Sequence, residues 1–132
     1  MENKISKVSL LWVIIMIGFM AHIITDILPA FWGVNIAMPD ATGVAPTGMM
    51  LFMIGTAFFV PICGLFCMNY RSSKTMRVIN LVLAGAMMLF NIFHVCELFM
   101  EFNPVQLLIY PVMVVLGIYL FIYSFRLVKQ KN

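Results

Sequence analysis

Charged residues are scarce in this sequence of 132 residues: Asp, Glu, Lys and Arg together make up 10% of it, whereas 64% is hydrophobic. A soluble domain carries about a quarter charged residues, so the composition excludes an ordinary soluble globular protein. The chain also lacks internal repeats, low-complexity tracts and any polar stretch long enough to form a soluble domain. We therefore expect an integral membrane protein with a single domain, residues 1–132.

The sequence also lacks the signatures of common catalytic and redox sites. It contains no Gly-rich phosphate loop and no HExxH motif, and its three cysteines form no CxxC pair. A membrane enzyme that uses His94 and Glu97 as acid and base stays open, but no residue is predicted to be catalytic. The thirteen methionines are scattered over all the hydrophobic segments, so we interpret them as flexible packing residues rather than copper ligands.

Four hydrophobic segments are long enough to cross a membrane, which takes about 20 apolar residues. The connections between them are rich in Pro, Gly, Asn and Ser, which favour turns. The first segment is too long for the apolar part of a signal peptide and is interpreted as a membrane helix. The predicted fold is all-α, a four-helix transmembrane bundle. Its expected spans are residues 8–28, 47–69, 77–100 and 105–125.

Basic residues occur only before the first segment, between the second and third, and after the fourth. The two other connections contain Asp40 and Glu101 but no Lys or Arg. Because basic residues concentrate on the cytoplasmic side, both termini are predicted to be cytoplasmic. The net charge of +3 then reflects topology and contact with the lipid bilayer, and no nucleic-acid partner is expected. The basic residues are Lys4, Lys7, Arg71, Lys74, Arg77, Arg126, Lys129 and Lys131.

Polar residues inside the first and third segments are predicted to meet in the outer half of the bundle. His22 and Asp26 are four residues apart, so they share one helix face. Asn91, His94 and Glu97 reach a comparable depth on the third segment, given a rise of about 1.5 Å per residue. Ionisable residues at membrane depth usually face the bundle interior and have a task or a partner.

Such a pocket has three competing uses. The His–carboxylate pairs could act as interhelical glue, contributing about 1 kcal/mol. They could bind a small molecule, an ion or a proton, because a histidine beside a carboxylate in a low dielectric can titrate near neutral pH. They could also bind a divalent metal through His22, Asp26, His94 and Glu97. However, the third segment has the order His-x-x-Glu, whereas di-metal bundles use Glu-x-x-His.

Short motifs along the chain resemble a known family. These are "LLWVIIM" at 10–16, the intramembrane Asp26, "VPI" at 60–62 and "RVIN" at 77–80. The layout is similar to DoxX-like small four-helix bacterial membrane proteins, closest to a subfamily of unknown function. The resemblance implies a fold, a topology and a bacterial plasma membrane, but no activity. Members often have Tyr in place of His22, and often a Glu on the fourth helix where this chain has Met113.

The sequence therefore predicts a membrane protein that binds a small molecule, ion or proton in a pocket formed by His22, Asp26, Asn91, His94 and Glu97. The alternative is a non-catalytic accessory subunit of a larger membrane complex, in which the polar cluster is interhelical glue. A homo-oligomer, a membrane partner protein and a lipid ligand are all compatible with this pattern. The sequence does not name the ligand.

Overall fold

The computed structural model describes residues 2–37, 41–70, 73–100 and 103–130, and in this part of the chain every regular element is a helix. Four helical stretches are long and apolar enough to cross a membrane: Ser6–Trp32, Thr47–Asn69, Lys74–Phe99 and Gln106–Val128. The prediction of an all-helical chain with four such segments is confirmed. The second stretch has the predicted bounds, and the first extends a few residues beyond both predicted ends.

Each of these stretches consists of more than one helical element. The elements are α1 (Glu2–Ile27), η1 (Leu28–Trp32), α2 (Thr47–Ile54), η2 (Gly55–Phe59), α3 (Val60–Asn69), α4 (Lys74–His94), α5 (Glu97–Met100), η3 (Gln106–Leu108) and α6 (Tyr110–Val128). The 3₁₀ turn η1 follows α1 at Pro29, and the π-helical turn η2 joins α2 to α3. The third stretch breaks after His94, where α4 ends, and resumes at Glu97.

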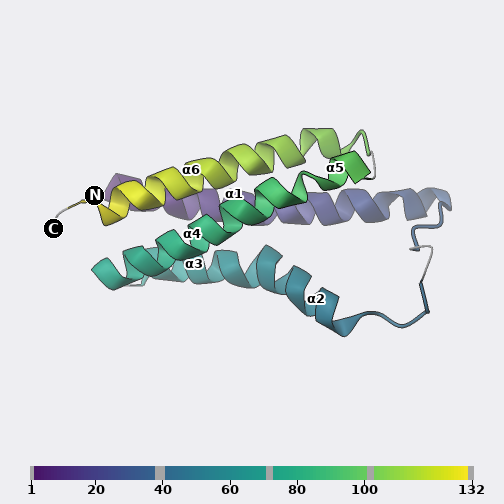
Figure 1. Ribbon diagram of the computed structural model, residues 1–132, viewed down its shortest axis with the longest axis horizontal. Coiled ribbons are helices and arrows are strands. Elements are labelled where there is room, and N and C mark those ends of the chain that lie inside the picture. The colour runs from purple at the N-terminus through teal and green to yellow at the C-terminus, as the bar shows by residue number, and fades with distance from the viewer. Residues whose placement is uncertain (1, 38–40, 71–72, 101–102, 131–132) are drawn as a thin grey trace.

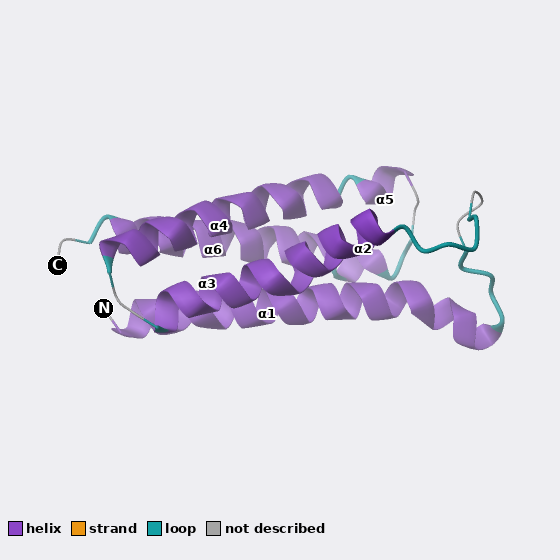
Figure 2. Ribbon diagram, turned by 90° about the horizontal axis from the view of Figure 1, so that it is seen from below, coloured by secondary structure: helices purple, strands orange, loops and turns teal. Residues whose placement is uncertain are grey.

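The four rods run antiparallel along one axis (Figures 1 and 2). The start of α1, the end of α6 and the α3–α4 connection lie at one end of the bundle, and the two other connections lie at the opposite end. Lys7, Lys74, Arg77, Arg126 and Lys129 therefore gather at the first end. We call this end the basic end. The other end holds Asp26 and Glu97 beside the two histidines, and we call it the acidic end.

Helices α1 and α4 face each other diagonally across the bundle, since each of them packs against both α3 and α6. Their side chains meet between those two neighbours: the rings of Phe19 and Phe90 lie 5.8 Å apart. The first and third segments therefore face each other, which is the arrangement in which their polar residues can meet.

A buried hydrogen-bonded chain holds this diagonal near the basic end. The fully buried Trp12 donates its indole N–H to Asn80 Oδ1 over 2.8 Å, and Asn80 Nδ2 donates to Ser124 Oγ over 2.8 Å. Gly64 on α3 makes room for the indole, because a Cβ there would lie 2.2 Å from Trp12 Cε2. These hydrogen bonds connect α1, α4 and α6. Each polar group in the chain has a partner, as a buried polar network requires.

Helix α2 leans away from the bundle (Figure 1). Every residue of α2 is exposed, whereas Pro61 and Gly64 on α3 are buried. The bend coincides with η2 and with Pro61, which has no N–H for the preceding helical turn. Thr56 Oγ1 donates to the carbonyl of Phe52 over 2.8 Å, a bond that further favours bending.

Candidate functional site

The two histidines of the chain meet at the acidic end of the bundle. His22 on α1 and His94 at the end of α4 bring their Nε2 atoms within 3.2 Å. Their rings are nearly perpendicular, with centroids 4.9 Å apart. His94 also stacks on Phe90, at 5.2 Å between ring centroids. The depth and the helix face predicted that the polar residues of the two segments meet. The structure places the two histidines in direct contact.

Each histidine has a carboxylate from its own segment beside it. Asp26 Oδ2 lies 3.5 Å from His22 Nε2, one helical turn along α1. Glu97 Oε1 lies 2.9 Å from His94 Nδ1, because the chain turns between the end of α4 and the start of α5. The imidazoles are mostly buried, but the carboxylate side chains are 48% and 55% exposed. The cluster thus has a buried centre and acidic groups at its rim.

The hydrogen-bond chain assigns the protons of the neutral pair. Glu97 as a carboxylate can only accept, so His94 Nδ1 carries a proton and His94 Nε2 is an acceptor. His22 Nε2 must then donate across the 3.2 Å contact, which leaves His22 Nδ1 unprotonated. That Nδ1 atom is buried and makes no hydrogen bond within the described part of the chain.

Two residues of the fourth segment complete the site, and the sequence interpretation missed both. Gln106 Nε2 donates to Thr25 Oγ1 over 2.9 Å and to Asp26 Oδ1, so it positions the carboxylate from η3. Tyr110 donates its hydroxyl to Glu97 Oε2 over 3.1 Å. Its ring lies 5.1 Å from that of His22, centroid to centroid. Their spacing in the sequence could have identified them. Gln106 and Tyr110 are four residues apart, so they share a helix face at the depth of His22.

Asn91 belongs to the predicted site but contacts a different group. Its Nδ2 atom donates to the carbonyl oxygen of Met113 over 3.1 Å. Gly117 makes this approach possible, since a Cβ there would come within 3.0 Å of Asn91 Nδ2. The amide binds the backbone of α6 rather than either histidine. Its Oδ1 atom is buried and has no partner among the residues described.

The four predicted metal ligands do not surround one point. Glu97 contacts Nδ1 of His94, whereas His22 contacts Nε2 on the opposite side of the same ring. An ion beside the two Nε2 atoms would therefore be out of reach of Glu97. Within the described ranges, no group of three or more His, Cys, Asp or Glu side chains is placed to hold a metal ion.

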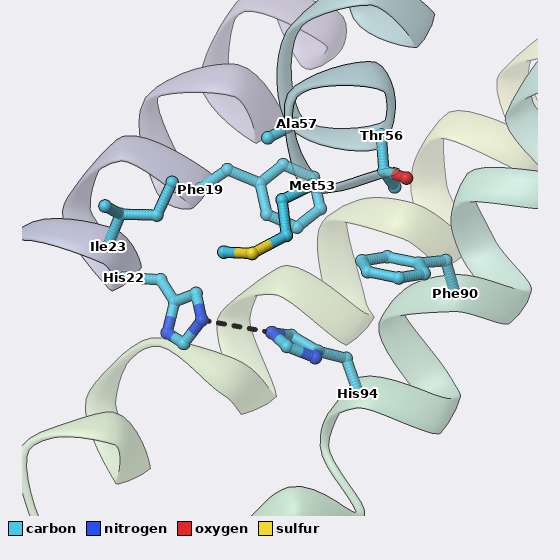
Figure 3. Close-up of a pocket in the computed structure, with 8 residues that line it drawn as sticks. All are labelled: Phe19, His22, Ile23, Met53, Thr56, Ala57, Phe90 and His94. Carbon is cyan, nitrogen blue, oxygen red and sulfur yellow. Dashed lines mark hydrogen bonds between the residues drawn. The ribbon is translucent and has the colours of Figure 1, made fainter. Parts of the chain in front are cut away.

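A small cavity of about 40 Å³ opens beside the histidine pair (Figure 3). It lies under the bend between α2 and α3, so the outward lean of α2 uncovers it. Its walls are almost entirely apolar. Besides the two imidazoles, the lining side chains are Phe19, Ile23, Met53, Thr56, Ala57 and Phe90.

Comparison with known proteins adds no family to this geometry. No protein-family model, no curated protein and no solved structure matches the chain.

Proposed function

We propose that this chain is a multi-pass protein of a bacterial plasma membrane that binds a cation, either a proton or a metal ion, at the His22–His94 pair. Four stretches long and apolar enough to cross a membrane support the multi-pass arrangement. The collection of basic residues at one end of the bundle supports cytoplasmic termini. The resemblance to DoxX-like proteins supports a bacterial origin, and membership of that family is part of the proposal.

The observation that carries the proposal is a surplus of acceptors at the acidic end. His22 Nδ1, Asn91 Oδ1 and Gln106 Oε1 are buried without a partner in the described residues, and each can accept a hydrogen bond in the neutral arrangement. Two carboxylates stand beside the pair, and the sequence places no Lys or Arg at this end. The carboxylates and the unpaired acceptors favour a positive charge here, against the cost of burying that charge.

The size of the cavity favours a cation over a larger ligand. Pockets for small organic molecules usually measure about 300–1,000 Å³, whereas this cavity measures about 40 Å³. It has room for an ion with one or two water molecules, since one water needs about 10–15 Å³. A lipid or another small molecule would require α2 to move.

Nitrogen NMR of the histidine rings tests this function directly. The chain has only two histidines, so ¹⁵N-histidine labelling of untagged protein in detergent gives two ring systems. We expect a through-bond coupling between the two Nε2 atoms, which lie 3.2 Å apart. We also expect the pair to take up its first proton as a unit. Two rings that take up protons independently, without this coupling, would contradict the proposal.

Interhelical glue in an accessory subunit is the second candidate function. Gln106 favours it, because its bonds to Thr25 and Asp26 connect η3 to α1. Under this reading a partner membrane protein or a second copy would cover the exposed apolar surface. Replacing His94 would then destabilise the bundle about as much as breaking the Trp12–Asn80 bond, and would change no binding property.

The orientation gives a separate prediction. A reporter domain fused after Thr42 is expected to be extracytoplasmic, and one fused after Ser73 cytoplasmic, because basic residues flank only the second position. A pair of reporters active on opposite sides, such as alkaline phosphatase and green fluorescent protein, measures both positions. A cytoplasmic reading at Thr42 would contradict the proposed placement of the histidine pair in the outer half.

A further inference from the structure

We infer that the cation site at the histidine pair selects a soft monovalent metal ion, Cu(I) or its redox-inert analogue Ag(I), bound by His22 Nε2, His94 Nε2 and the thioether sulfur of Met53. This inference rests on the proposed function, because it names the ligand of the same site. It adds Met53, a residue that the sequence pattern assigned to packing.

The position of Met53 is the first argument. It is the residue of α2 that lines the cavity together with both histidines. Figure 3 shows its side chain reaching from α2 toward the imidazoles, with the sulfur on the side of the two Nε2 atoms. All three methionines of this helix are exposed, but Met49 and Met50 do not line the cavity. One of three neighbouring methionines is therefore directed at the pair.

The spacing of the histidines is the second argument. Two imidazole nitrogens that bind one ion at ~2.0 Å, with an angle of about 105–120° between the bonds, lie about 3.2–3.5 Å apart. The observed separation of the Nε2 atoms is 3.2 Å. The present separation of the two nitrogens therefore suits one ion that bridges them.

His94 already has the environment of a metal-binding histidine. Its Nδ1–H donates to Glu97 Oε1 over 2.9 Å, and Tyr110 fixes the other carboxylate oxygen. Metal-binding histidines commonly donate their second N–H to a carboxylate, which fixes the tautomer and makes the free nitrogen a better ligand. The free nitrogen here is Nε2, the atom that faces His22. When the ion binds, the proton on His22 Nε2 moves to Nδ1.

The chemistry of the cavity selects the kind of ion. Thioether sulfur and imidazole suit Cu(I), whereas Mg²⁺ and Ca²⁺ prefer several oxygen ligands. Three of the four carboxylate oxygens already have partners: Asp26 Oδ1 accepts from Gln106, and the two Glu97 oxygens contact His94 and Tyr110. Apolar walls limit the number of water ligands. The charge of Asp26, 3.5 Å from His22 Nε2, favours a cation in this low-dielectric space.

The test uses Ag(I), and Cu(I) under anaerobic reducing conditions, with untagged protein in detergent. Ring nitrogens are followed by ¹⁵N-histidine NMR and the methionine methyl groups by ¹³C NMR. We expect one equivalent of ion to shift both Nε2 signals and the Met53 methyl signal, and to protonate His22 Nδ1. Ions bound only by Cys63, Cys67 or Cys96 would leave the ring nitrogens unshifted, and that outcome overturns the inference.

Two matched variants make the assignment specific. Met53→Leu is expected to lower the affinity for Ag(I) at least tenfold, measured by competition with a chelator, because it removes the sulfur and keeps the apolar volume. Met49→Leu, on the same helix but away from the cavity, is expected to leave the affinity unchanged. Equal affinities of Met53→Leu and the unmodified protein would overturn the inference.

A harder ion would also be visible in this design. Tight Zn(II) binding that is lost in Asp26→Asn and unaffected by Met53→Leu would place the site with carboxylate ligands and overturn the soft-ion assignment. Failure of this inference is distinguishable from failure of the proposed function. If the two rings share a proton but no metal ion shifts them, only the metal assignment is wrong. If the rings titrate independently and bind no ion, both are wrong.

Discussion

Gly64→Ala is expected to destabilise the bundle by about 2–3 kcal/mol, although alanine is the better helix former by about 1 kcal/mol. The new Cβ would lie 2.2 Å from Trp12 Cε2 and 2.4 Å from Nε1. The indole is fully buried and hydrogen-bonded to Asn80, so it has no room to move aside. Overpacking of a well-packed core usually costs about 1–3 kcal/mol. Reversible unfolding in mixed micelles measures the difference.

Two other glycines serve as matched controls for this prediction. Gly48→Ala on α2 meets nothing within 4 Å, so it is expected to be neutral or slightly stabilising. Gly18→Ala would contact Met113 Sδ, the flexible part of a side chain that can turn away, so its effect is expected to be smaller than that of Gly64→Ala. If Gly64→Ala is as stable as Gly48→Ala, the Trp12–Gly64 contact does not anchor α1 to α3.

Asn80→Leu and His94→Phe are expected to have opposite consequences, because they alter the two polar crossings between α1 and α4. Asn80→Leu leaves the Trp12 N–H and the Ser124 hydroxyl without their partners. Unpaired buried groups cost about 1–3 kcal/mol each, so we expect a loss of about 2 kcal/mol in stability with unchanged Ag(I) affinity. His94→Phe preserves a ring on Phe90. We expect it to lose Ag(I) binding by at least a hundredfold and to lose less stability than Asn80→Leu does. His22 Nε2 keeps Asp26 Oδ2 3.5 Å away, and the Glu97 side chain is 55% exposed to solvent.

Unfolding in mixed micelles and chelator competition give the two readouts for each variant. Adding Trp12→Phe to Asn80→Leu is expected to recover part of the lost stability, because it removes one of the unpaired donors. If His94→Phe destabilises the protein as much as Asn80→Leu does, the polar cluster at the acidic end acts as glue, and the accessory-subunit reading is favoured over cation binding.

The sequence was sufficient to predict the helices and the meeting of the two histidines. Long apolar runs define the helices through length alone, and the second segment was predicted to the residue, Thr47–Asn69. His22 and His94 could be paired because ionisable side chains at membrane depth face the bundle interior and usually have a partner there. The rim positions of Asp26 and Glu97 were not predicted, because exposure depends on where each helix ends.

The rest of the site depends on side-chain contacts between helices, which the spacing of residues in the sequence does not predict. Gln106 and Tyr110 were overlooked because only the first and third segments were searched for polar residues at this depth, although the fourth segment also reaches it. Asn91 was expected in the pocket, yet Gly117 lets its amide reach the backbone of α6 instead. Met53 looked like one packing methionine among thirteen, and only the bend at η2 brings it to the cavity.

The outward lean of α2 makes the molecule wedge-shaped, wider at the acidic end than at the basic end (Figure 1). In a bilayer crossed as proposed, such a wedge displaces more lipid from the outer leaflet than from the inner one. In such a bilayer we expect tighter lipid packing around the acidic end to favour positions of α2 nearer to α4, and so a narrower opening over the histidine pair.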